Sequence, residues 1–235
     1  MTEKKVLGII GGVGPLATML LGEMIVKRTK AQTDQQHVNM VITNNTSIPD
    51  RTTYILDRSK ANPVPVMISD AVKLKSIGAE VLAIPCNTAH SFYQDIQLGA
   101  ADIQVLHMID ETAKRAAQIG AKKVGILATT GTLTTSVYQL ACQHAGVQPI
   151  VPDEETQKLV MSVIYDDVKA GRPVDFLKWQ QIMNKFDELG CDRIILGCTE
   201  LSIVKKELNL DDMYIDSLMV LAESAILACG YELKD

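Results

Sequence analysis

Short apolar runs alternate with longer amphipathic segments along the 235-residue chain. The apolar runs have the length of buried strands and predict strands at residues 5–10, 38–43, 81–84, 104–108, 124–128, 147–151, 193–196 and 214–215. The amphipathic segments, several of them closed by a glycine, predict helices at residues 16–31, 66–77, 88–97, 110–119 with Asp110 as N-cap, 134–145, 154–170, 175–189 and 217–229. Because this alternation is typical of parallel β-α-β units with helices on both sheet faces, we expect an α/β fold.

The second half of the chain repeats features of the first. Residues 78–87 align without a gap on residues 190–199, at an offset of 112, and both copies contain a glycine, two spacers, a strand, a turn and a cysteine. Residues 7–10 align on residues 124–127 at an offset of 117. Any two βα units share some likeness, but the same features in the same order favour an internal duplication.

The duplication predicts two pseudo-symmetric domains, each a parallel four-stranded sheet flanked by helices. We place the first domain at residues 1–110, completed by residues 214–235, and the second at residues 111–213. Ligands of open α/β sheets bind beyond the carboxyl ends of the strands, so the active site is expected in the cleft between the domains.

Composition limits the expected partners and location. Hydrophobic residues make up 47% of the chain and charged residues 22%, as in a folded, water-soluble protein. The net charge of -5 arises without long single-sign blocks, so nucleic acid is not an expected partner. No apolar segment reaches the roughly 18 residues of a membrane span and no secretory leader is recognisable, so we expect a cytoplasmic protein with no membrane partner.

The cysteines and histidines lack the spacing of metal ligands. Five cysteines, an odd number without a Cys-x-x-Cys pair, favour free thiols in a reducing compartment. The four histidines form no His-x-x-x-His motif and no Cys/His cluster, so we expect no metal.

Two of the cysteines stand where strands end. Cys86 and Cys198 each follow an apolar strand and precede residues that can cap a helix, whose amide groups attract an anion and lower the pKa of a nearby thiol. Two opposed acid/base groups acting on one carbon are what inversion of an amino acid requires, because one thiolate removes the α-proton and the other thiol returns a proton. For the other cysteines, Cys142, Cys191 and Cys229, we expect only a packing role.

Four motifs together identify a known family. They are Pro85-Cys86-Asn87-Thr88-Ala89-His90, Gly197-Cys198-Thr199-Glu200-Leu201, the opening Gly11-Gly12-Val13-Gly14-Pro15-Leu16-Ala17-Thr18 and the loop Pro49-Asp50-Arg51. In this order they resemble the aspartate/glutamate racemase family, most closely its aspartate racemases, over nearly the whole chain. The resemblance implies a racemase without a cofactor, usually a homodimer, in which Cys86 and Cys198 are the two catalytic bases.

The resemblance also implies roles for residues around the thiols. Asn87, Thr88 and Thr199 resemble the family's ligands of the substrate α-carboxylate, while Arg51 and Lys169 resemble the two cations that hold the side-chain carboxylate. Read without the resemblance, Lys169 would be a solvated helix end. Two cations around one carboxylate would select an acidic amino acid. The predicted substrate-binding set is completed at the two sheet edges by Gly12, in a turn whose amides face the substrate anion, and Thr130.

Departures from the family pattern bear on the substrate. Val13 stands where aspartate racemases commonly have methionine, and Glu200 stands where glutamate racemases typically have histidine. The Asp-Ser opening of glutamate racemases and the Gly-Gly-Met-Ser-Trp opening of broad-specificity racemases are both absent. The substrate interpretation therefore leans towards aspartate.

Other interpretations stay open. The same scaffold could racemise glutamate or a range of amino acids, act as an isomerase or decarboxylase of dicarboxylates, or bind an acidic metabolite without catalysis. Residues 12–17 fit the dinucleotide pattern G-x-G-x-x-A, but a proline interrupts it and the second strand lacks the acidic residue that would hold a ribose, so no nucleotide cofactor is expected. His90 follows Cys86 by one helical turn and is expected to pack or cap rather than to activate the thiol. Asp50 either orients Arg51 or begins a helix.

Overall fold

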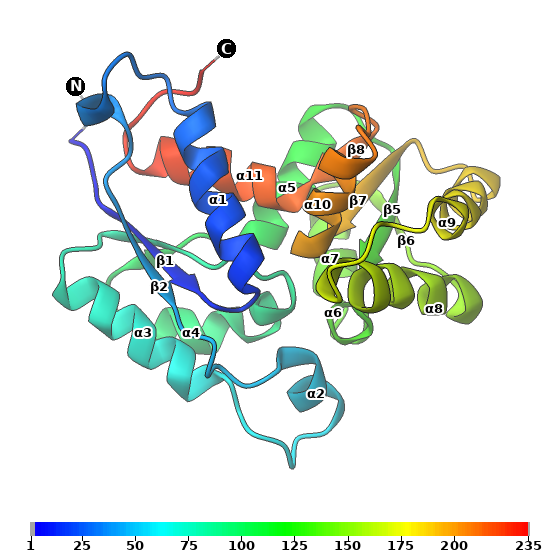
Figure 1. The fold of residues 1–235 in the computed structure, drawn as a ribbon, viewed down its shortest axis with the longest axis horizontal. Coiled ribbons are helices and arrows are strands. Elements are labelled where there is room, and N and C mark those ends of the chain that lie inside the picture. Colours follow the sequence, from blue (N-terminus) through cyan, green and yellow to red (C-terminus); the bar gives the residue numbers. More distant parts are fainter. Residues whose placement is uncertain (1–2, 235) are drawn as a thin grey trace. The chain divides into compact units, whose positions relative to one another are not determined.

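Two parallel four-stranded sheets organise residues 3–234, the part of the chain that this computed structural model describes (Figure 1). The first sheet has the order β2-β1-β3-β4 and is built from β1 (Leu7–Gly11), β2 (Met40–Asn44), β3 (Val81–Ala83) and β4 (Gln104–Val105). The second has the order β6-β5-β7-β8 and is built from β5 (Lys123–Ala128), β6 (Gln148–Ile150), β7 (Arg193–Gly197) and β8 (Tyr214–Asp216). The predicted α/β fold with two four-stranded sheets is confirmed, and β3 and β7 hold equivalent places.

The first sheet is covered on both faces because its strand side chains alternate. Leu7 and Ile9 pack with α1 (Pro15–Arg28) and α11 (Ser217–Ala228) on one face (Figure 1). Ile10 packs on the other face with α3 (Val64–Ser76) and α4 (Tyr93–Gly99). Burial of each such aliphatic side chain contributes about 1.5–3 kcal/mol, so the sheet is held from both sides.

The second sheet has its own core. Leu127, Ile194 and Leu196 contact buried side chains of α8 (Glu154–Ser162), α9 (Phe176–Glu188) and α10 (Thr199–Glu207). Phe186 of α9 lies directly over Gly125 of β5, where an added Cβ would come within 2.5 Å of its ring. The remaining helices of this half are α5 (Met108–Gln118), α6 (Thr130–Thr134) and α7 (Val137–His144).

The chain divides into two compact units whose limits differ from the predicted domains. The first unit holds the described residues up to Met108 and from Leu218 onward, and the second is Ile109–Ser217. Assigning all of residues 214–235 to the first domain was wrong for β8, because β8 pairs in parallel with β7 in the second sheet. Ser217 also belongs to the second unit, where its hydroxyl donates to Leu196 O at 2.6 Å.

Several helix boundaries also differ from the prediction. Asp110 is not an N-cap but lies in the first turn of α5. The helix predicted at 134–145 begins later, at Val137 of α7, because Ser136 before it takes a left-handed φ of 55° and the separate helix α6 ends at Thr134. The predicted helix at 154–170 changes after α8 into a π-helix, η3 (Val163–Lys169).

Some elements were not predicted at all. The loop after β2 contains α2 (Arg51–Leu56), and Asp50 begins this helix by accepting a hydrogen bond from Thr53 N at 2.7 Å. A short 3-10 turn, η1 (Asp34–Gln36), was not predicted either, whereas the helix predicted at 88–97 is present as a 3-10 helix, η2 (Thr88–Phe92), followed by α4.

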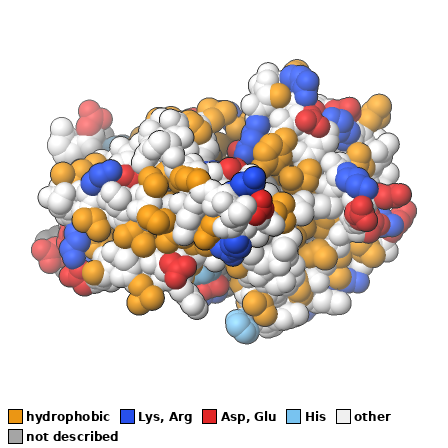
Figure 2. All heavy atoms as spheres, turned by 90° about the horizontal axis from the view of Figure 1, so that it is seen from below, with side chains coloured by type: hydrophobic (Ala, Val, Ile, Leu, Met, Phe, Trp, Pro, Cys, Tyr) orange, Lys and Arg blue, Asp and Glu red, His pale blue; other side chains and the backbone are white. Residues whose placement is uncertain are grey.

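One face of the described protein is mixed in charge. On the face shown in Figure 2, basic and acidic side chains are interspersed among apolar ones, so this face offers no continuous basic surface to a polyanion. Along residues 3–234, no helix combines the length and the apolar character needed to cross a membrane.

Candidate active site

The first thiol follows β3. Cys86 is 7% exposed, and the adjacent Asn87 and Thr88 are 2% and 6% exposed. His90, one turn further on, fixes this segment: Met108 N donates to its Nε2 at 3.1 Å, so its Nδ1 carries the proton and donates to Cys86 O at 2.9 Å. The expected packing role of His90 is confirmed, because both ring nitrogens bond to backbone groups.

Burial makes His90 a source of acid sensitivity. Its pKa is lowered from 6.5 to about 4, first by loss of hydration and then by repulsion from His107. The unfolded chain therefore binds more protons than the folded protein between these pH values, so stability falls as the pH drops from about 6.5 to 4, by up to about 3 kcal/mol for this group. We expect His90→Gln to flatten the pH dependence of the unfolding free energy in this window, measured by urea denaturation. Parallel curves for the two proteins would contradict this role.

The glycine turn after β1 sits against the loop after β2. Gly12 has a φ of +87°, and a Cβ there would lie 2.4 Å from the backbone of Asn45. Its own N–H donates to Thr18 Oγ1 at 3.0 Å, and Thr18 Oγ1 donates to Gly14 O at 2.9 Å. The amide of Gly12 therefore faces Thr18, contrary to the expectation that it faces the substrate. What Gly12 contributes is the close approach of two loops at the sheet edge.

Arg51 begins α2, beyond the end of β2. Its Nη1 donates to Pro49 O at 3.1 Å and to Ile48 O at 3.4 Å, so the guanidinium folds back over its own loop. Because the Asp50 carboxylate caps Thr53 N, the helix-start alternative for Asp50 is confirmed.

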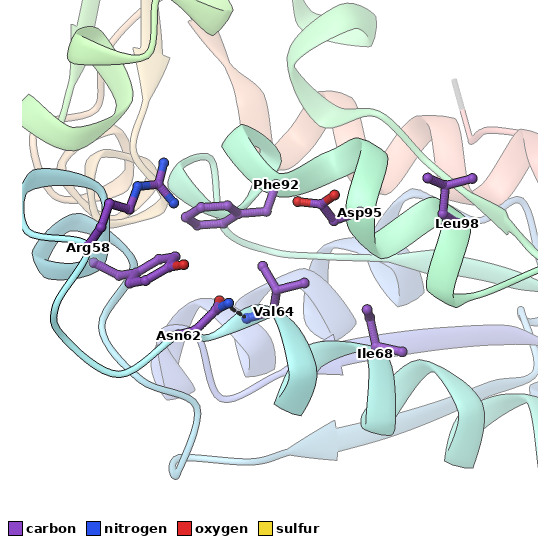
Figure 3. Close-up of a pocket in the computed structure, with 8 residues that line it drawn as sticks. Arg58, Asn62, Val64, Ile68, Phe92, Asp95 and Leu98 are labelled. Carbon is purple, nitrogen blue, oxygen red and sulfur yellow. Dashed lines mark hydrogen bonds between the residues drawn. The ribbon is translucent and has the colours of Figure 1, made fainter.

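A pocket lies beside α2, and side chains that line it connect this helix to its neighbour. Its volume is about 360 Å³, and Figure 3 shows Arg58 and Phe92 reaching towards it from different segments. Arg58 stacks 4.6 Å from the ring of Tyr54 in α2 and 5.6 Å from the ring of Phe92 in η2. These contacts join the helix that starts with Arg51 to the one that starts with Thr88.

The second thiol follows β7. Cys198 is the N-cap of α10 and is 6% exposed, and Thr199 is 3% exposed. Cys198 Sγ donates to Glu200 Oε2 at 2.9 Å, and Thr199 Oγ1 donates to the same oxygen at 3.4 Å. Lys169 Nζ lies 3.6 Å from Glu200 Oε1 and 4.3 Å from the ring centre of Tyr165. The structure thus brings three predicted site residues, Cys198, Thr199 and Lys169, around one carboxylate.

The Cys198 thiol is a weak acid in this arrangement. Burial raises its pKa well above the ordinary value, the charge of Glu200 and the hydrogen bond to it raise the pKa further, and the Lys169 ammonium opposes them. The expectation that a helix N-terminus lowers the pKa of this thiol is therefore wrong, because desolvation and an adjacent carboxylate outweigh the helix end.

Thr130 lies at the corresponding edge, after β5. Its N–H bonds to Met161 Sδ at 3.3 Å, and Gln157 Nε2 donates to Thr130 Oγ1 at 3.3 Å and to Ala128 O at 3.0 Å. Among the described residues, Gln157 Oε1 is a buried acceptor with no hydrogen-bond partner. A pocket of about 450 Å³ opens here and includes Thr130 and Tyr165 in its lining. An N–H donor of a ligand would suit that unpaired oxygen.

The sequence profile of the Asp/Glu/hydantoin racemase family matches residues 10–225. The chain belongs to this family. It is similar over 94% of its length to the broad specificity amino-acid racemase RacX of Bacillus subtilis, at 29% identity and with 96% of that protein covered.

Solved structures support the assignment. The Picrophilus torridus aspartate racemase matches with a TM-score of 0.77 and 29% identity, covering 98% of this chain and 96% of that one. An aspartate racemase homologue from Pyrococcus horikoshii matches in fold with a TM-score of 0.77 at 22% identity, covering 96% and 99%. The protein is therefore an amino-acid racemase, an isomerase of the Asp/Glu racemase family.

Two residues of this racemase that contact predicted site residues, Glu200 and Gln157, were not themselves predicted as part of the site. Glu200 was not predicted as a site residue, although a carboxylate two residues after a cysteine at a helix start lies within reach of its thiol. Gln157 had no sequence signal, since its position beside Thr130 depends on how α8 packs on β5.

Proposed function

We propose that this racemase interconverts L- and D-aspartate by a two-base mechanism with Cys86 and Cys198. The observation that carries the proposal is the equivalence of β3 and β7: each is the neighbour of a central strand in a sheet of the same order, and each is followed by a buried cysteine. A duplicated fold that presents a thiol at the same place in both copies suits a reaction with two mirror-image proton transfers.

In the proposed reaction one cysteine, as thiolate, takes the α-proton of the bound amino acid. The electron pair of the broken C–H bond delocalises into the α-carboxylate, and the other cysteine, as thiol, donates a proton to the opposite face of the α-carbon. Asn87, Thr88 and Thr199 are proposed to donate hydrogen bonds to the α-carboxylate, where negative charge develops. The proposed chemistry uses no cofactor.

Arg51, at the start of α2, and Lys169, at the end of η3, are two cations that favour an acidic substrate. We propose that Arg51 and Lys169 bind the side-chain carboxylate and that Gly12 and Thr130 also belong to the substrate-binding set. Aspartate is the substrate in the name of the Picrophilus torridus structure, which supports this assignment. The Bacillus subtilis relative is named for broad specificity, so turnover of a wider range of amino acids is the second candidate.

A homodimer is also proposed, and light scattering in solution tests it.

The decisive experiment is proton exchange in D₂O. L-Aspartate incubated with the protein, without added metal or pyridoxal phosphate, is expected to gain α-deuterium as D-aspartate forms, followed by NMR and chiral chromatography. A parallel panel of glutamate, alanine and other amino acids distinguishes the two candidates. Faster turnover of a neutral amino acid than of aspartate would contradict the aspartate assignment, and tight aspartate binding without exchange would indicate a binding protein.

Removing the Arg51 charge is expected to weaken aspartate recognition. Arg51→Leu should raise KM for aspartate by roughly 10–100-fold, since a charge-assisted hydrogen bond contributes about 1.5–3 kcal/mol. Steady-state kinetics check this, with Lys206→Leu as the control because Lys206 is an exposed cation near the end of α10. An unchanged KM in Arg51→Leu would remove this residue from the proposed site.

A further inference from the structure

Glu200 stands between a thiol and an ammonium group. Its Oε2 accepts the hydrogen bond from Cys198 Sγ, and its Oε1 faces Lys169 Nζ at 3.6 Å. The carboxylate side chain is only 12% exposed, while that of Lys169 is 34% exposed. The two oxygens therefore have different partners, one a reacting atom and the other a cation that solvent and a ligand can reach.

This arrangement fixes the resting state of Cys198. Because its sulfur donates the hydrogen bond, Cys198 is a thiol, which can give a proton but cannot take one. For the enantiomer that presents its α-proton to Cys198, the thiol must first lose its own proton. The Glu200 oxygen at 2.9 Å is in position to receive it, and the Lys169 ammonium lies 3.6 Å from the other oxygen of the same carboxylate.

We propose that Glu200 takes the proton of Cys198 when the side-chain carboxylate of an acidic substrate occupies Lys169. The inference rests on the proposed racemase function and on the role proposed there for Lys169. In the step, the Sγ–H bond breaks, an Oε2–H bond forms, and the electron pair stays on sulfur as the thiolate. A substrate carboxylate that shares the ammonium weakens its hold on Oε1, so Glu200 becomes the stronger base.

Tyr138 and Asp216, two other titratable residues of the second unit, have other hydrogen-bond partners. Tyr138 of α7 stays neutral, since burial raises its pKa far above neutrality. Asp216 at the end of β8 accepts a hydrogen bond from Ser202 Oγ at 2.6 Å, and Tyr165 of η3 lies under the Lys169 ammonium. Glu200 is thus the acceptor that the geometry provides. It follows that selection of acidic substrates acts on formation of the thiolate as well as on binding.

The first measurement needs no turnover. The rate of alkylation of Cys198 by iodoacetamide, quantified by mass spectrometry across pH, reports the pKa of this thiol in the substrate-free protein. Glu200→Gln should lower that pKa by about one unit or more, because a charge that opposes the thiolate is removed. Lys169→Met should raise it. An unchanged profile in Glu200→Gln would overturn the inference even if racemisation of aspartate is confirmed. The expected shifts without racemisation would refute the proposed function instead.

The second measurement separates proton transfer from a structural role. In Glu200→Gln, α-deuterium exchange should fall by about 10²-fold or more for the aspartate enantiomer that Cys198 deprotonates, and should persist for the other enantiomer through Cys86. Equal losses for both enantiomers would indicate a structural effect and overturn the proposal.

The third measurement tests the control by Lys169. Succinate, a dicarboxylate without an α-amino group, should produce the infrared signal of a protonated carboxyl group in the wild-type protein but not in Glu200→Gln. Acetate, which offers one carboxylate, should not produce it in either protein. A signal that persists in Glu200→Gln, or none with succinate in the wild type, would overturn the control by Lys169.

Discussion

Cys86→Ala and Cys198→Ala are each expected to reduce racemisation of aspartate by about 10³-fold or more while the protein stays folded. General acid–base groups contribute about 10²–10⁴-fold, and inversion needs both of them in every turnover. Replacing a buried thiol by a methyl group changes little volume, so stability should fall by only about 1 kcal/mol. Circular dichroism and urea denaturation check the fold, and chiral chromatography measures the rate.

Cys142→Ala is the matched control for both variants. Cys142 is also fully buried, and burial raises its pKa to about 12, but it lies within α7 and not at the end of a strand. It should retain near-normal kinetics. If Cys198→Ala racemised aspartate at the normal rate, the two-base mechanism would be wrong.

Gly12→Ala is expected to cost about 2–5 kcal/mol of stability and to remove most activity. A left-handed φ costs an alanine about 1–2 kcal/mol, and the new Cβ would also overlap the backbone of Asn45 at 2.4 Å, which no side-chain rotation can relieve. The loops after β1 and β2 would have to separate at the edge of the sheet where Arg51 and Thr88 lie.

Gly146→Ala isolates the conformational part of that cost. Gly146 has a φ of +76°, but an added Cβ would meet nothing within 4 Å. The Gly146→Ala protein should lose only about 1 kcal/mol of unfolding free energy and keep its activity. The difference in stability between the two variants, measured by urea denaturation, therefore reports the cost of the clash at Gly12. Equal destabilisation of the two proteins would mean that the loops at Gly12 have room to adjust.

Sequence periodicity predicted the strands of both sheets, because each is a short apolar run whose alternate side chains enter two cores. The duplication also predicted the equivalence of Cys86 and Cys198. Periodicity could not predict local departures from regular helix geometry. Ser136 takes a left-handed conformation between α6 and α7, and the π-helix η3 ends at Lys169, whose ammonium lies 3.6 Å from Glu200.

The ionisation states of the site residues were harder to predict than their identities. A cysteine at a helix start suggested a lowered pKa, and only the structure shows that Cys198 is buried and bonded to Glu200. The predicted domain boundary at residue 214 was wrong for a related reason. Tyr214–Asp216 has the same strand pattern whichever sheet it joins, and its partner is decided by hydrogen bonds to β7 that local sequence does not encode.

The return of the chain to the first unit has a consequence for synthesis on the ribosome. Leu221 and Ile226 of α11 are fully buried in the core of the first sheet, and Arg28 of α1 donates to Glu223 Oε1 at 2.8 Å. The second unit is encoded without interruption and can complete its core as soon as it emerges. The first unit cannot complete its core until α11 has been synthesised, so the apolar face that α11 covers stays exposed until then.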